Sequence, residues 1–256
     1  MADISTAIGL FNFAIDCFGR IQIARGFEDD FAIYQLKLDI LQLRLSRWGV
    51  VVGINDSSNS IIKDDTTDVT SPAGILKSIK KFLDRAQRDG DNKLNPGDKP
   101  FDSDSDMPDD LKGIRTKFKE CLKKRVMRAE IAVESLKWAF YKKAKLEEFI
   151  GNITSLITAL EAQLSPDLEA KLRELSKEEC TGIDKPDLQE LRGIVEESDP
   201  WLQKAVGEQL EHVPGGASYN INQSHIKGTA TGVHYGDVMG VSNGDGNSTK
   251  NYWGRK

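Results

Sequence analysis

Residues able to do acid–base or nucleophilic chemistry are few and lie mostly at one end of the chain. The three histidines are His212, His225 and His234, and the residues before them contain none. A Ser-His-Asp triad or a Cys-His pair therefore cannot form within that long first part. An HExxH zinc helix is absent as well. We expect no catalytic residue and predict that the protein is not an enzyme.

Metal ligands are present, but their spacings do not match a known site. The run Asp102-x-Asp104-x-Asp106 begins like a calcium-binding EF-hand loop. Met107 then stands where that loop needs glycine, and Gly113 where it needs a bidentate glutamate. The three histidines have irregular spacing, which is unusual for a zinc site. We expect neither a bound metal nor a cofactor.

Cysteine usage and the N-terminus indicate the cellular compartment. Cys17, Cys121 and Cys180 are widely spaced and form no CxxC pair, which favours buried, reduced thiols over a disulfide framework. The start Met1-Ala2-Asp3 lacks the positive charge of a secretory signal. These features predict a cytoplasmic protein.

Composition predicts a globular, helix-rich protein that does not bind nucleic acid. The chain has 256 residues, of which 39% are hydrophobic and 29% are charged, and its net charge is −5. A net acidic charge argues against nucleic acid as a general partner. One basic cluster is interpreted as the solvated face of a charged helix: Lys117, Lys119, Lys123, Lys124, Arg125 and Arg128.

Five prolines stand where helices are expected to begin, since proline at the first helical position loses no hydrogen bond. They are Pro72, Pro108, Pro166, Pro186 and Pro200. The resulting helices predict an all-α, multi-helix bundle over residues 1–212, followed by a separate tail over residues 213–256. Polar loops are expected over residues 53–70 and 89–108.

Two long helical patterns are expected to build the core of this bundle. Residues 31–48 carry apolar side chains three and four positions apart, which predicts a central helix with one apolar stripe. The same period over residues 111–145 predicts a second long helix. Shorter helices are predicted over residues 146–164, 166–180, 186–197 and 200–211.

The first predicted helix, residues 4–24, is apolar around most of its circumference. One interpretation is a core helix wrapped by the others. The other is a segment able to enter a bilayer once it is released, and the two can be two states of one segment. The candidate membrane-active residues are Ile4, Ile8, Leu10, Phe11, Phe13, Ile15 and Phe18.

The tail has a composition unlike the rest of the chain. Glycine recurs at every fourth position, so in an extended chain these glycines share one face, and β-branched and aromatic residues gather on the other. Such a segment can stack between identical strands, whereas its Gly, Asn and Ser content is equally typical of disorder. The tail is therefore expected to be disordered or conditionally β-forming. The candidate assembly residues are Gly228, Gly232, Val233, Tyr235, Gly236, Val238, Gly240 and Val241.

The helical part resembles the HET-s/LopB domain family of filamentous fungi, called HeLo. The resemblance is carried by Gly9-Leu10-Phe11-Asn12, by Asp16-Cys17-Phe18 and above all by one motif. That motif consists of Arg44, Leu45, Ser46, Arg47, Trp48 and Gly49. The tail lacks the twofold repeat of HET-s prion segments, and its glycine spacing is closer to that of other fungal amyloid motifs.

The resemblance implies a cell-death effector that acts in heterokaryon incompatibility. Templated cross-β assembly of the tail would release the N-terminal apolar segment, which would permeabilise membranes. The implied partners are an amyloid template for the tail and membrane lipid after activation, with relocation from the cytoplasm to the membrane. A homodimer through the helical domain is a further expectation. The alternative is a helical interaction or scaffold protein, linked to incompatibility or pathogenicity, that never enters a membrane.

Overall fold

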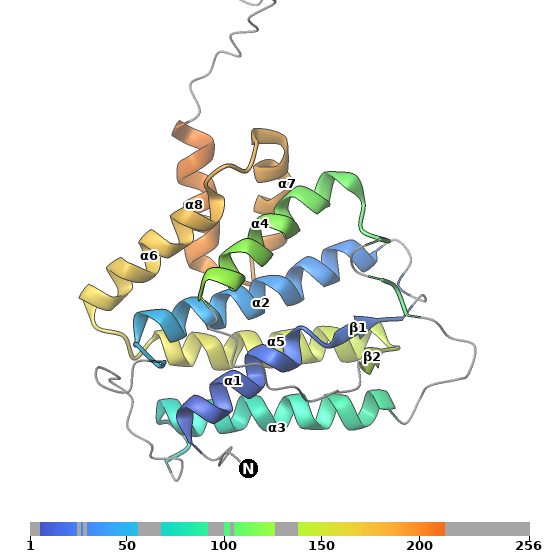
Figure 1. The fold of residues 1–256 in the computed structure, drawn as a ribbon, viewed down its shortest axis with the longest axis vertical. Coiled ribbons are helices and arrows are strands. Elements are labelled where there is room, and N and C mark those ends of the chain that lie inside the picture. Colours follow the sequence, from blue (N-terminus) through green and yellow to red (C-terminus); the bar gives the residue numbers. More distant parts are fainter. Residues whose placement is uncertain are drawn as a thin grey trace, which may run out of the picture. The chain divides into compact units, whose positions relative to one another are not determined.

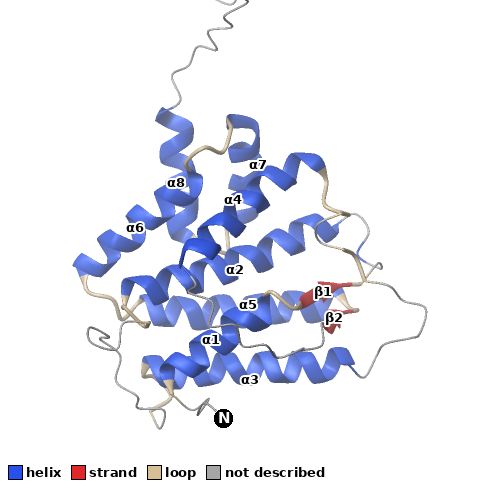
Figure 2. Cartoon of the chain, viewed as in Figure 1, coloured by secondary structure: helices blue, strands red, loops and turns tan. Residues whose placement is uncertain are grey.

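The computed structural model describes residues 6–24, 27, 30–55, 68–91, 100–102, 105–125 and 138–212. These residues are mostly helical, which confirms the all-α prediction (Figure 2). The helices are α1 (Ala7–Phe18), α2 (Phe31–Val51), α3 (Pro72–Asp91), α4 (Asp109–Arg125), α5 (Lys143–Glu161), α6 (Pro166–Cys180), α7 (Lys185–Val195) and α8 (Pro200–His212). The tail and its assembly residues lie outside the described residues, so the boundary near residue 212 stays a prediction.

Helix α2 is the centre of the bundle, as its sequence predicts (Figure 1). Helices α1 and α5 pack on one side of it, and α3 packs on α1 and α5. Helices α4, α6 and α7 pack on the other side, with α8 against α6 and α7. Because both sides are covered, α2 buries residues around most of its circumference, and the predicted single stripe is too narrow a description.

Prolines begin the helices where the sequence indicates. Pro72, Pro166 and Pro200 are the first residues of α3, α6 and α8, and Pro186 lies in the first turn of α7. Pro108 immediately precedes α4 and its carbonyl accepts from the amides of Leu111 and Lys112. Capping side chains add to this signal: the Ser71 Oγ accepts from the Gly74 amide at 3.0 Å.

Two short strands correct the sequence prediction in two places. The strand β1 (Ile21–Ile23) pairs in parallel with β2 (Trp138–Phe140). The first helix therefore ends at Phe18 and does not continue to residue 24, and residues 111–145 are not one helix. Both stretches have helical periodicity, but the β-branched and aromatic side chains of β1 and β2 also suit a buried strand pair. Pairing between these distant segments favours the strand over the helix in both.

Candidate functional site: the N-terminal helix and its anchor

Helix α1 is a core element of the resting protein. Of the predicted membrane-active residues, Leu10, Phe11, Ile15 and Phe18 are buried. Phe13 is half-buried against the core, Ile8 is 38% exposed, and Ile4 lies outside the described residues. The Thr6 Oγ1 caps the helix by accepting from the Gly9 amide at 3.2 Å. The structure thus shows the core-helix arrangement, and the membrane role of these residues stays a prediction.

The C-terminal part of α2 forms the seat on which α1 lies. The ring centroids of Phe11 and Trp48 are 6.4 Å apart. Gly49 lies directly beneath Phe11, since a Cβ added at Gly49 would overlap the Phe11 ring. Two turns earlier on the same face, the Gln42 Nε2 donates to the Ile15 carbonyl at 2.9 Å. These three α2 residues hold α1 through both side-chain and backbone contacts.

Helices α3 and α5 complete the enclosure of α1. The Lys80 Nζ lies 4.4 Å from the Phe13 ring centroid, a cation–π contact, and also pairs with Asp84 at 2.6 Å. The Phe18 ring packs 6.4 Å from that of Phe149 in α5. Helix α1 therefore contacts three helices: α2, α3 and α5.

Two fully buried arginines lie immediately before the Trp48-Gly49 seat. Arg44 forms a bidentate pair with Glu161 of α5, with distances of 2.9 and 2.6 Å. Its remaining donors reach the Ser198 carbonyl at 2.9 Å and the Thr158 hydroxyl at 3.0 Å. The planar guanidinium fork therefore joins α2 to α5 and to the segment that leads into α8.

Arg47 joins α2 to α6 and to the residue that precedes α8. Its Nε donates to Glu179 of α6 at 3.1 Å, its Nη1 to the Ser176 hydroxyl at 2.6 Å, and its Nη2 to Asp199. Arg125, the last residue of α4, also donates to Glu179. Together, Arg44, Arg47 and Arg125 face Glu161, Glu179 and Asp199, and we call these six residues the arginine hub.

The arginine hub is electrically balanced, with three positive and three negative groups. Its acidic members have exposed fractions of 7%, 0% and 0%, so none can be stabilised by bulk water. Burial is the largest influence on Glu179 and raises the pKa of this carboxyl, although Arg47 and Arg125 act against the rise. Removal of any one member would leave an uncompensated buried charge, which is strongly destabilising.

Asp199 connects this hub to the base of α8. Its Oδ1 accepts from the amides of Trp201 at 3.2 Å and Leu202 at 3.0 Å, which satisfies two free donors at the helix start. The sequence predicts a helix start at Pro200 but not the ion pair of Asp199 with Arg47. Arginines three residues apart inside an apolar helix indicate that buried acidic partners exist, but the acids lie more than a hundred positions away.

The recognised motif therefore has two structural functions. Arg44 and Arg47 belong to the hub, whereas Trp48 and Gly49 form the seat of α1. Leu45 is core, and the Ser46 Oγ donates to the Leu43 carbonyl at 2.7 Å within the helix. One continuous stretch of α2 thus touches both the N-terminal helix and Asp199, the residue that caps α8.

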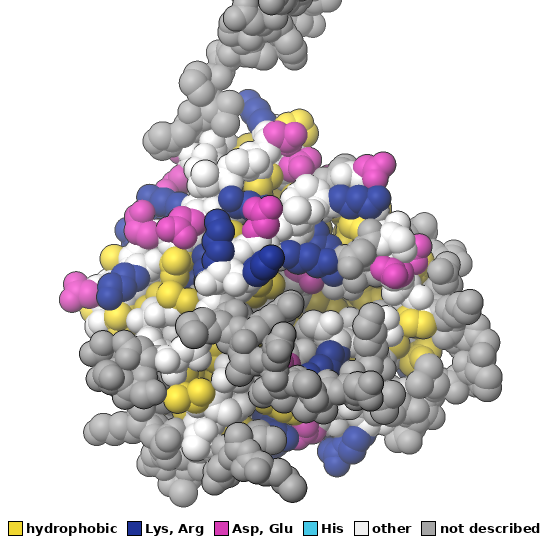
Figure 3. Space-filling model, viewed as in Figure 1, with side chains coloured by type: hydrophobic (Ala, Val, Ile, Leu, Met, Phe, Trp, Pro, Cys, Tyr) yellow, Lys and Arg dark blue, Asp and Glu magenta, His cyan; other side chains and the backbone are white. Residues whose placement is uncertain are grey.

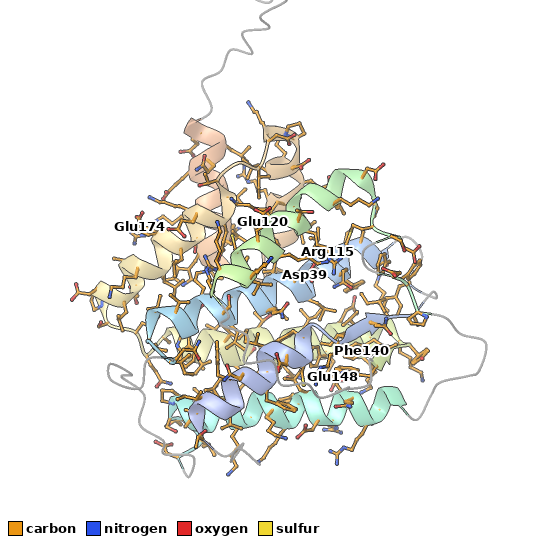
Figure 4. All side chains as sticks on the ribbon, in the orientation of Figure 1. Asp39, Arg115, Glu120, Phe140, Glu148 and Glu174 are labelled. Carbon is orange, nitrogen blue, oxygen red and sulfur yellow. The ribbon has the colours of Figure 1, made fainter. Side chains whose placement is uncertain are left out.

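A second buried pair fixes α4 to α2. The Arg115 Nε donates to Asp39 Oδ2 at 2.7 Å, and the Gln35 Nε2 donates to Asp39 Oδ1 at 3.1 Å (Figure 4). Desolvation raises the pKa of Asp39, against the opposing attraction of Arg115. This pair lies outside the hub.

In the described part of the chain, no group of His, Cys, Asp and Glu side chains could hold a metal ion. Over the same residues, no helix combines the length and apolar character needed to cross a membrane. All three cysteines are buried and free, and burial raises the pKa of Cys17 to about 11 and that of Cys180 to about 12.

A family model described as HeLo, prion-inhibition and propagation, matches residues 2–194. Heterokaryon incompatibility protein s of Podospora anserina is 27% identical over 213 residues, which cover 81% of this chain and 72% of that protein. Heterokaryon incompatibility protein S of Podospora anserina strain S is also 27% identical, over 216 residues with the same coverage.

Solved structures agree with these matches. A doubly substituted HET-s N-terminal domain superposes with a TM-score of 0.73 at 26% identity, covering 81% of this chain and 99% of that one. A second HET-s N-terminal domain structure gives a TM-score of 0.71, also at 26% identity, with coverages of 80% and 97%.

Proposed function

Because the chain belongs to the HeLo family and is related to the HET-s heterokaryon incompatibility proteins, we propose that it is a cell-death effector whose tail assembly releases α1 to disrupt membranes. In this proposal the resting protein is cytoplasmic and relocates to the membrane on activation. Its partners are an amyloid template for the tail and, afterwards, membrane lipid. No enzymatic step is needed.

The observation that carries the proposal is the contact route between the last described helix and the first. Asp199 caps α8, which ends at His212, where the tail begins in the sequence. Asp199 also pairs with Arg47, and the next two residues of α2 are the Trp48-Gly49 seat of α1. A disturbance at α8 therefore has to cross only one ion pair to reach α2 beside α1.

Detachment of α8 would disturb both buried arginines. Arg47 would lose Asp199, and Arg44 would lose the Ser198 carbonyl. A buried guanidinium that loses its partners either draws water into the core or moves outward, and each response displaces the adjacent turn of α2. The Trp48-Gly49 seat lies in that turn, so α1 would lose part of its enclosure.

Release would expose an apolar surface suited to a membrane interface. Helix α1 contains Leu10, Phe11, Ile15 and Phe18, with Asp16 as its one acidic residue. At 1.5 Å per residue its twelve residues reach about 18 Å, shorter than the roughly 30 Å hydrocarbon core. Interfacial insertion, or elongation of the helix after release, is therefore the mechanism we propose.

The test is seeded assembly with full-length protein in the presence of dye-loaded vesicles. Preformed fibrils of the tail peptide, residues 217–256, should trigger dye release by the full chain and none by a chain truncated after residue 212. Fibre diffraction of the seeded protein should show an inter-strand spacing of about 4.7 Å. Absence of that spacing under all seeding conditions would refute the trigger.

A matched pair of variants tests whether α1 is the membrane-active element. Ile8 of α1 and Ile33 of α2 are 38% and 39% exposed, so lysine at either position should be tolerated by the resting fold. Ile8→Lys should abolish dye release, because it places a charge on the surface that enters the bilayer, whereas Ile33→Lys should not. Equal release by both variants would refute α1 as the membrane-active element. A stable dimer from which no variant releases dye, the original protein included, would favour an interaction or scaffold protein.

A further inference from the structure

The outward face of α3 carries a basic stripe, with Asp84 beside it and paired to Lys80. Lys77, Lys81, Arg85 and Arg88 follow one another at spacings of four, four and three residues, and all four are exposed. At 3.6 residues per turn these spacings place them on one side of the helix. In Figure 3 a few dark blue groups, with a magenta group among them, show between grey atoms near the lower edge of the molecule, where Figure 1 places α3.

The opposite face of the same helix is the one that holds α1. Leu76, Ile79 and Leu83 are buried on this inner face, and α3 packs closely on α1 and α5. Adjacent helix axes are about 8–10 Å apart. A ligand bound to the basic stripe of α3 is therefore separated from α1, the candidate membrane-active segment, only by the thickness of α3.

A cavity of about 100 Å³ opens at the C-terminal end of the stripe, between α3, β2 and α5. Aromatic rings form its apolar wall and basic side chains stand at its mouth, and Figure 4 labels Phe140 and Glu148 there. The wall contains Phe82, Phe140 and Phe149, and the mouth Arg85, Lys142 and Lys145. Asp89 and Glu148 also line the cavity, and Glu148 accepts from Lys145 at 2.7 Å.

We propose that the basic stripe of α3, with the cavity at its end, lets the cytoplasmic resting protein bind reversibly to membranes that contain anionic phospholipid, before activation relocates it stably to the membrane. Basic side chains match anionic headgroups, and an apolar cavity beside them suits an amphiphile better than a purely ionic polymer. The purpose of docking, to place α1 near the bilayer before release, rests on the function proposed above. The docking itself requires neither tail assembly nor release of α1.

Charge distribution gives this docking its orientation. The whole chain has a net charge of −5, so most of its surface is repelled by an anionic membrane. Helix α4 also carries many lysines, but it packs on α2, α6 and α7, whereas α3 packs on α1. Both helices have acidic residues among the basic ones, Glu120 on α4 (Figure 4) and Asp84 and Asp89 on α3, so position and not charge distinguishes them. Only the α3 stripe combines a run of basic residues with proximity to α1 among the described helices.

Vesicle sedimentation of the unseeded full-length protein tests the proposal. The protein should bind vesicles of phosphatidylcholine mixed with phosphatidylserine, and not vesicles of phosphatidylcholine alone. Replacement of Lys77, Lys81, Arg85 and Arg88 by glutamine should weaken this binding at least about tenfold. Added salt should weaken the binding of the original protein and have little further effect on the variant.

A charge-matched variant provides the control. Glutamine at Lys117, Lys119, Lys123 and Lys124 removes the same number of positive charges from α4 and should leave vesicle binding within about twofold. Equal loss in both variants would mean a non-specific charge effect and would overturn the proposal. Binding of duplex DNA through α3 without vesicle binding would also overturn it and would assign the stripe to nucleic acid.

Circular dichroism of both variants separates misfolding from lost docking, because exposed lysines and arginines can be replaced without loss of helicity. Failure of the proposed function has a different signature. If seeded protein never releases dye but the α3 dependence of unseeded binding holds, docking stands and the release mechanism falls. If release occurs without any α3-dependent docking, the reverse conclusion applies.

Discussion

At the scale of single residues, Gly49 decides how closely α1 can approach α2. The Phe11 ring occupies the space in which any other residue would place its Cβ. Gly49 has no need of glycine for its backbone conformation, because it lies within a regular helix. Glycine is required here by its neighbours: the Phe11 ring first, and then the Ile54 Cγ2, which would lie 3.2 Å from an added Cβ.

Gly49→Ala should therefore lower the free energy of unfolding by about 1–3 kcal/mol, since overpacking forces the Phe11 ring out of its position. Urea denaturation measures the change. Gly151 in α5 is the matched control, because nothing lies within 4 Å of an added Cβ there. Gly151→Ala should stabilise the protein by about 0.5–1 kcal/mol through helix propensity. Equal effects at the two positions would contradict the close approach.

At the scale of elements, α1 is held at each end and along its length. Thr6 caps its start, and its end is followed directly by β1, whose parallel pairing with β2 fixes the chain beyond Phe18. The Ala24 amide extends this pairing by donating to the Phe140 carbonyl at 3.0 Å. The helix cannot move far while β1 remains paired.

Cys17 provides a chemical reporter of α1 release. Its thiol is buried in α1, and burial raises its pKa to about 11 from an ordinary value of 9.0, so the reactive thiolate is scarce at neutral pH. Iodoacetamide labelling, followed by peptide mass spectrometry, should modify Cys17 at least about tenfold faster after seeding than before. Because the unfolded thiol loses its proton first, the same shift makes the resting fold less stable as pH rises from 9 towards 11.

Cys121 and Cys180 are internal controls in the same labelling experiment, because they lie in α4 and α6. Slow labelling of these two beside fast labelling of Cys17 indicates selective release. Labelling of all three together would indicate global unfolding and would contradict a discrete α1 step.

Much of the element order was predictable from local signals, and the parts that were not depend on distant contacts. Proline starts and apolar periodicity place α2, α3 and α5–α8 to within a few residues. The β1–β2 pair could not be predicted, because Ile21-Gln22-Ile23 and Trp138-Ala139-Phe140 also fit a helical period. The motif from Arg44 to Gly49 can be recognised in the sequence, but its division into hub and seat depends on the positions of Glu161, Glu179 and Asp199.

At the scale of the whole molecule, the arginine hub connects helices that otherwise pack as two groups on α2. Arg44 reaches α5 on one side, and Arg47 reaches α6 and the start of α8 on the other. Ion pairs of this kind have strict geometric requirements, so the two groups are expected to keep one relative arrangement or to lose it together.

Asp199→Asn tests this coupling without removal of the helix cap, since asparagine caps as well as aspartate does. Loss of one charge from the buried set should lower the free energy of unfolding by about 3 kcal/mol. Hydrogen exchange of the unseeded protein should become faster in α8 and in α1, while the α3–α5 contact stays protected.

The control for this variant is Glu208→Gln, which removes a carboxylate from the same helix. Glu208 pairs with Lys177 at 3.2 Å on the surface, so its loss should change little. Faster exchange in α8 alone after Asp199→Asn would show that the hub does not transmit to α1. Uniformly faster exchange in all helices would show simple global destabilisation.

The long separation between α1 and its partners also has a consequence during synthesis on the ribosome. Phe18 cannot contact Phe149, and Ile21 cannot pair with Trp138, until the later residue of each pair has been synthesised. At about 5–20 residues per second, synthesis of the roughly 130 residues between Phe18 and Phe149 takes roughly 7–26 seconds. Through that interval the most apolar helix of the nascent chain lacks part of its cover. We expect chaperone binding to be concentrated on α1 during translation. The helix that is proposed to act on membranes after activation therefore also needs protection while the chain is being synthesised.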